Sequence, residues 1–265
     1  EAEPLLRRAL ALRRTAFGER DAATAQAYAR VAANLDAQGR HAEAEPLYRM
    51  ALATDRDLRG ADHPATAADT ADLGANLAAQ GRHGEAEPLL RRALTIRRKA
   101  LGEAHFDTGV SYAALADTLA ARGKPREAEK LHRRALQIVI ASRGERHPAA
   151  ADAYAGLAAD LAARGRHAEA APLLEKALEL RRAVLGERHP QTVRAYDALA
   201  DNQHRLAENG RAETYASQAV DIVRARRNAD LKAAGSDPDA AIRRARANAA
   251  PGAAEEPVFR RYLTV

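Results

Sequence analysis

Apolar residues recur along the chain at steps of three and four positions. The first full segment shows this pattern at Tyr28, Val31, Ala32 and Leu35. Such spacing places apolar side chains on one face of an α-helix. Glycines follow the segments, where they commonly end helices. The pattern predicts helices over 1–16, 21–38, 41–58, 63–80, 83–100, 105–122, 125–142, 147–164, 167–184 and 189–207.

The helical pattern is a sequence repeat. Ala32–Leu52 reads AANLDAQGRHAEAEPLYRMAL, and similar text returns at Gly74–Leu94, Ala116–Leu136 and Ala158–Leu178. The turn glycines Gly39, Gly81, Gly123 and Gly165 set a step of 42 residues. A fixed period of this length is typical of a solenoid, in which each repeat packs on its neighbours. We expect an all-α array over 1–232, with about five helix pairs and a partial repeat at the N-terminus.

The two ends of the chain depart from the repeat. Glu1–Leu10 aligns with Glu43–Leu52 without a gap, so the chain starts inside a repeat and we expect a fragment of a longer protein. In the last unit Ala207 replaces the turn glycine, and we expect Asn209-Gly210 to form the turn instead. Residues 233–265 are expected to be a linker and tail, with a possible short helix over 239–248.

Prolines and glycines mark the joints between repeats. The joints read GADHPAT, GEAHFDT, GERHPAA and GERHPQT. Pro64, Pro148 and Pro190 stand where a helix begins, which suits proline. Another set, Pro46, Pro88 and Pro172, lies one turn inside the second helices, where a lost hydrogen bond predicts a local widening or kink.

Composition narrows the function classes. The chain has 265 residues, no cysteine and a net charge of +6. Disulfides and thiolate chemistry are therefore excluded. An apolar run of about 18 residues, which a membrane span requires, is missing from the sequence. We expect a cytoplasmic protein, and the excess of alanine and arginine favours a GC-rich bacterial source.

Histidines are the main candidates for metal ligands, but their spacing speaks against that role. His63, His105, His147 and His189 share one repeat position, and His41, His83 and His167 share another. Equivalent positions in stacked helices lie roughly 8–10 Å apart, whereas one zinc ion needs ligands about 2 Å away. We therefore interpret these histidines as capping and joint residues. We predict no metal site, no cofactor and no catalytic residue.

His132 stands where the other repeats have Tyr48, Leu90 and Leu174. We interpret it as a partly buried, hydrogen-bonded side chain. Asp and Glu recur with the period, as they do on solvated helix faces. Arginine pairs also recur, for example at Arg91/Arg92 and Arg133/Arg134, but acidic residues lie one turn away and stacking aromatics are missing from these rows. This balance disfavours nucleic acid as a partner.

These features resemble the tetratricopeptide repeat (TPR), in the 42-residue form of kinesin light chains. In the first unit the family positions fall on Tyr28, Val31, Ala32, Leu35, Gly39, Ala44, Tyr48 and Ala51. Departures occur at Thr70, His132 and Gln203. The resemblance implies a right-handed superhelix with a concave groove that binds a peptide or helix of a partner protein. By transfer, the groove is lined by Gln26, Ala29, Ala33, Asp36, Ala71, Ala75, Val110, Ala113, Asp117, Asp152, Ala155, Ala159, Arg194, Asp197, Asp201, His204 and Arg205.

The sequence leaves several interpretations open. The groove lacks, in its first four units, the Lys, Arg and Asn set with which some family members clamp a carboxylate. Its alanines suit the close approach of a partner, but they also simply allow tight winding of the superhelix. The favoured function is a protein-interaction scaffold, which could also bind its own tail through Phe259, Tyr262 and Leu263. The alternative is a regulatory or substrate-recruiting segment of a larger signalling enzyme, such as a caspase-like peptidase or an NTPase. The oligomeric state stays open.

Overall fold

Eleven α-helices make up residues 2–233, the part of the chain that the computed structural model describes. The helices are α1 (Ala2–Phe17), α2 (Ala22–Ala37), α3 (His41–Arg59), α4 (Pro64–Ala79), α5 (His83–Leu101), α6 (Phe106–Ala121), α7 (Pro125–Arg143), α8 (Pro148–Ala163), α9 (His167–Leu185), α10 (Pro190–Arg205) and α11 (Asn209–Ala233). Five pairs, from α2/α3 to α10/α11, follow the single helix α1. The predicted helices are confirmed to within one or two residues at most ends.

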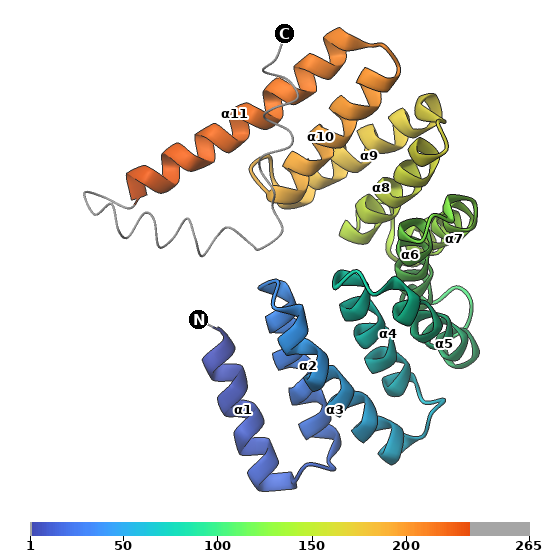
Figure 1. Ribbon diagram of the computed structural model, residues 1–265, viewed down its shortest axis with the longest axis vertical. Helices are drawn as coiled ribbons and strands as arrows, with labels where there is room; N and C mark the ends of the chain where they lie inside the picture. Colours follow the sequence, from blue (N-terminus) through green and yellow to red (C-terminus); the bar gives the residue numbers. More distant parts are fainter. Residues whose placement is uncertain (1, 234–265) are drawn as a thin grey trace.

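The helix pairs follow a curved path (Figure 1). Each helix packs against the helices before and after it in the chain. The first helices of neighbouring pairs also touch one another, since α4 contacts α6 and α6 contacts α8. Such contacts place the first helices on the inner side of the curve. The structure thus confirms an all-α solenoid of helix pairs.

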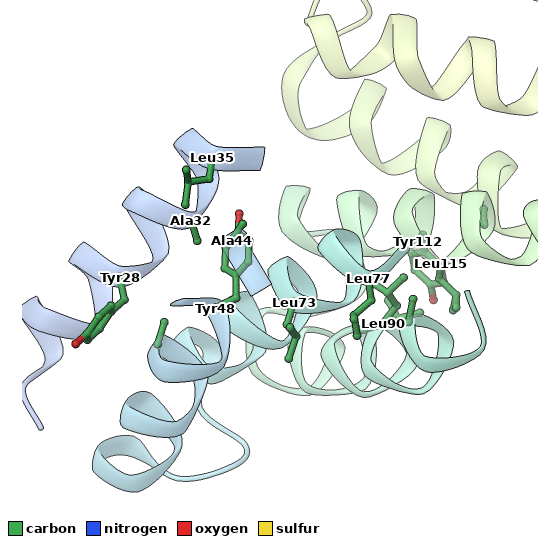
Figure 2. Packing of buried hydrophobic residues seen from close by; sticks show 14 of the residues in the cluster. Tyr28, Ala32, Leu35, Ala44, Tyr48, Leu73, Leu77, Leu90, Tyr112 and Leu115 are labelled. Atoms are coloured by element: carbon green, nitrogen blue, oxygen red, sulfur yellow. The ribbon is translucent and has the colours of Figure 1, made fainter. Parts of the chain in front are cut away.

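Each pair is held by a core of alanine, leucine and tyrosine. Figure 2 shows Tyr28, Ala32 and Leu35 of α2 and Tyr48 of α3 among the buried residues. Ala32, Leu35, Ala44 and Ala51 are completely buried. Alanine at the crossing of two helices lets their backbones approach closely, while the larger side chains fill the space beside it. The alanines that recur in each repeat therefore set the distance between the two helices of a pair.

Glycine closes the turn inside each pair. Gly39 has φ 75°, and its N–H donates to Asp36 O while the N–H of Arg40 donates to Leu35 O. These two bonds form a Schellman cap, which needs a left-handed residue at that position. Gly81, Gly123 and Gly165 repeat the arrangement.

The turn of the last pair differs from the prediction. Ala207 itself adopts φ 61°, its N–H donates to His204 O, and the N–H of Glu208 donates to Gln203 O. The cap is thus the same as at the glycines, and Asn209 already begins α11. The prediction of a turn at Asn209-Gly210 is wrong, because helix packing keeps the 42-residue register and imposes the left-handed conformation on alanine.

The joints between pairs are built from a histidine and a threonine. His63 Nδ1 accepts the N–H of Ala65 at 3.1 Å and so caps α4. Thr66 donates its hydroxyl to Gly60 O at 2.8 Å. His105, His147 and His189 cap α6, α8 and α10 in the same way. The interpretation of these histidines as capping residues is confirmed.

Some sequence predictions lie beyond these observations. Pro46, Pro88 and Pro172 lie inside α3, α5 and α9, and the kink expected at them stays a prediction. The possible helix over 239–248 and the apolar residues Phe259, Tyr262 and Leu263 lie outside the described residues. The boundary at residue 232 between array and tail also stays a prediction.

Candidate functional site: the inner wall of the solenoid

The candidate site is the solvent-accessible side of the first helices, which we call the inner wall. One row of it lies at a single repeat position on α2, α4, α6, α8 and α10, and every member of this row is exposed. The row consists of Ala33, Ala75, Asp117, Ala159 and Asp201. Small side chains therefore dominate an accessible row that continues along the array.

The other predicted groove residues fall on the same helices, with different exposure. Gln26, Val110, Asp152 and Arg194 form a second exposed row, and His204 and Arg205 are exposed near the end of α10. Ala29, Asp36, Ala113, Ala155 and Asp197 are partly exposed. Ala71 differs from the others because it is only 9% exposed. Neighbouring packing covers its methyl group, so it contributes little contact area, contrary to the prediction.

Aspartates are the charged residues of the central part of the wall. Helices α4, α6 and α8 contain no lysine or arginine. Asp72, Asp117 and Asp152 are exposed on them. Asp152 is contacted by Arg181 Nη2 at 3.0 Å. The centre of the wall is thus acidic in a chain whose net charge is +6.

Asp72 is partly desolvated by the protein around it. Solvent still reaches part of this residue. The resulting desolvation raises the pKa of Asp72; Arg97 opposes this rise and the Asp36 carboxylate adds to it. Asp36 itself accepts hydrogen bonds from Asn76 at 2.6 Å and from the His41 ring at 2.9 Å. The Asp36 carboxylate on α2 therefore acts electrostatically on Asp72 of α4, in the next repeat.

Asp117 contacts a buried histidine. His132 Nε2 on α7 lies 3.2 Å from Asp117 Oδ1, and His132 Nδ1 lies 2.6 Å from Asp160 Oδ2 on α8. The His132 and Asp160 side chains are 2% and 1% exposed, whereas the Asp117 side chain is 72% exposed. Burial alone would lower the pKa of His132, but Asp117 and Asp160 outweigh it and raise it to about 9. The ring is thus an imidazolium at neutral pH.

The sequence revealed only part of this cluster. Hydrogen bonding of His132 was predicted, but full burial and the role of Asp160 were missed. The sequence contained a signal, because His132, Asp160 and Gly156 all depart from the repeat. Asp160 stands at the position that Asn76 and Asn202 occupy in other repeats. Gly156 lies beside the ring, where an added Cβ would lie 2.6 Å from His132 Nε2.

On the second helices, Glu43, Glu85 and Glu127 are exposed as predicted, but one row of acidic residues thought to lie on solvated faces is buried. Glu45, Glu87 and Glu129 are 7–8% exposed. Arg82 reaches Glu45 from the next repeat at 2.8 Å, and Arg49 pairs with the same carboxylate at 2.5 Å. The prediction is wrong for this row because one carboxylate sits between two repeats and receives arginines from both.

The recurring arginines of the second helices form ion pairs of the same kind. Arg91 pairs with Glu87, Arg133 with Glu129, and Arg166 joins Glu129 to Glu169. Paired charges attract phosphate less than free ones. That nucleic acid is disfavoured as a partner stays a prediction.

A buried polar side chain interrupts the core of the last pair. Gln203 stands where the other repeats have leucine and is 1% exposed, yet neither polar atom of its side chain has a partner among the described residues. Burial and the nearby Asp201 raise the pKa of Asp197. A buried polar group without a partner costs stability. Gln203 therefore lowers the stability of the unit that carries the α10 part of the wall.

Among residues 2–233, no group of three or more His, Cys, Asp or Glu is arranged to hold a metal ion. In the same part of the chain, the helices are too short or too polar to cross a membrane.

Comparison with known proteins identifies the repeat. A family model described as the tetratricopeptide repeat matches residues 1–57, 37–99, 66–141, 107–183 and 149–225. No curated protein matches the chain in sequence. Among similar solved structures are nearly identical TPR-like repeats described as a kinesin light chain of Podosopora anserina. They are 24% identical, have a TM-score of 0.63, and the match covers 74% of this chain and 93% of that one. BtubC (BKLC) from P. vanneervenii is 20% identical with a TM-score of 0.68, and that match covers 83% and 87%.

Proposed function

The chain belongs to the tetratricopeptide repeat family, and we propose that it is a scaffold that binds a peptide or helix of a partner protein against its inner wall. Repeats of this family are in general protein-interaction modules. The observation that carries the proposal is the exposed row on the first helices, in which α2, α4 and α8 contribute the small residues Ala33, Ala75 and Ala159. Small side chains let the backbone of a bound segment come close, as in other helix-in-groove complexes.

Apolar contact supplies affinity, and the aspartates supply orientation, because charged groups select partners more than they add net affinity. The protein's own tail is a second candidate occupant, supported by its apolar residues Phe259, Tyr262 and Leu263.

The test is to block the wall with a bulky residue. Peptides are first selected for binding to the full chain from a displayed random library. Ala75→Trp and Ala159→Trp fill the wall, whereas Ala53→Trp and Ala168→Trp place the same side chain at exposed positions of second helices. We expect the first two variants to lose binding and the last two to keep it. Equal binding by all four variants would refute the proposal.

A further inference from the structure

The packing of the repeat does not require the charged cluster of Asp117, His132 and Asp160. At the position of His132 the other repeats have Tyr48, Leu90 and Leu174, which fill the same space without a charge. Burying an ion pair is expensive, and apolar residues of similar size often give an equally stable core. The cluster therefore calls for an explanation other than stability.

The side chains of Asp160, His132 and Asp117 form a chain of contacts that leads from the core to the inner wall. Asp160 is buried on α8 and holds Nδ1 of the ring, so that Nε2 points to the Asp117 carboxylate. Gly156 leaves room for the ring in this position. The ring contacts Oδ1 of Asp117 from the side of the core. Solvent reaches the remainder of this side chain, which is 72% exposed.

The surroundings of Asp117 indicate the charge of a ligand. Helices α4, α6 and α8 carry aspartates and no lysine or arginine. The exposed neighbours of Asp117 along its row are Ala75 and Ala159. An approaching segment would thus meet small apolar side chains and a fixed anionic group at the centre of the array.

We propose that Asp117 binds an arginine or lysine of a small-residue-rich helix that lies on the inner wall, with His132 and Asp160 as positioning residues. This inference rests on the proposed function and names the chemistry of the partner. A carboxylate that is already held in place loses little freedom on binding. Its bond to a guanidinium is charge-assisted and stronger than a neutral hydrogen bond.

The affinity test uses two labelled, alanine-based helical peptides that differ only in carrying arginine or glutamate. Fluorescence anisotropy measures their binding to the full chain. We expect the arginine peptide to bind at least about tenfold more tightly than the glutamate peptide, and Asp117→Asn to weaken it about tenfold, which is about 1.4 kcal/mol. Asp62→Asn is the matched control, because Asp62 is 59% exposed and lies in a joint. That variant should leave the affinity unchanged.

The role of the positioning residues has its own readout. The charged groups that set the pKa of His132 are Asp117 from α6 and Asp160 from α8. In the wild type, affinity for the arginine peptide should change as the pH rises through about 9, because a neutral ring can donate to only one of the two carboxylates and no longer offsets their charge. The double variant His132→Leu/Asp160→Asn should bind more weakly and lose this pH dependence, while the arginine of the peptide stays charged throughout.

The outcomes separate this inference from the proposed function. If the glutamate peptide binds as tightly as the arginine peptide, or if Asp117→Asn has no effect, the inference is wrong. If neither peptide binds but library-selected peptides still bind and are lost in Ala75→Trp, the inference is again wrong and the scaffold function stands. If the selected peptides are also insensitive to Ala75→Trp, both fail.

Discussion

Asp69 on α4 is a buried acid that should weaken the array at neutral pH. The residue is 8% exposed, and its Oδ2 has no hydrogen-bond partner among the described residues. Asp55 on α3 is also buried, and it pairs with Arg59 at 3.2 Å. Burial, together with the carboxylates of Asp55 and Asp72, raises the pKa of Asp69 to about 7, with Arg59 opposing.

The sign of the effect follows from proton linkage. In the unfolded chain the pKa returns to its ordinary value of 3.8, so between about pH 4 and 7 the folded state holds a proton that the unfolded state has lost. The contribution of Asp69 to stability is therefore most favourable below about pH 4, falls as the pH rises to about 7, and stays low above it. At 1.36 kcal/mol per pH unit, the difference amounts to about 4 kcal/mol.

The perturbation is Asp69→Asn, which removes the charge and keeps the shape. We expect a gain of about 2–4 kcal/mol at pH 8 and much less at about pH 4.5. Urea unfolding gives the overall change, and hydrogen exchange of the α3 and α4 amides gives the local one, since stability in a repeat array is partly local. Asp57→Asn, at an exposed position of α3, is the control and should change little. A gain from Asp69→Asn that is equal at both pH values would refute the reasoning.

Four further results are expected. Ala207→Gly should stabilise the last pair by about 1 kcal/mol, because a left-handed φ is unfavourable for alanine but not for glycine. Slower hydrogen exchange in α10 would show this gain. Ala150→Thr should add about 0.5–1.5 kcal/mol by restoring the hydroxyl bond that the other joints make, measured by urea unfolding. His132→Leu should cost about 3–5 kcal/mol by leaving a buried carboxylate unpaired, whereas adding Asp160→Asn should recover most of it, and a double-mutant cycle measures this coupling. Truncation after Lys232 should raise the affinity for a selected peptide if the tail occupies the wall, and an unchanged affinity would rule that out.

The architecture could be predicted from the sequence because local signals agree with the repeat. Glycines with positive φ end the helices at fixed steps, and the joint histidines cap the next ones. The prediction failed at Ala207 because turn rules are local, whereas packing along the whole repeat decides the register. A strained alanine costs less than moving a helix pair out of place.

The charged interior was harder to predict. Glu45 and Arg82 lie 37 positions apart in sequence, and the period alone does not say which row faces the next repeat. The recurrence of this spacing at Glu3–Arg40 and Glu129–Arg166 is a signal that could have been used. For the wall, the family resemblance selected residues of the first helices, and all of them except Ala71 are at least partly exposed. The contacts of His132 with Asp117 and Asp160 depend on three helices meeting in space.

Site-specific photo-crosslinking tests the central claim most directly. A photoreactive amino acid replaces Val110 on the inner wall in one variant and Val184 on α9 in another; the two valines are 39% and 44% exposed. Each variant is irradiated with a library-selected peptide that binds the full chain. The scaffold account predicts a crosslinked peptide from position 110 and little from position 184. Crosslinking at 184 with none at 110 would contradict it.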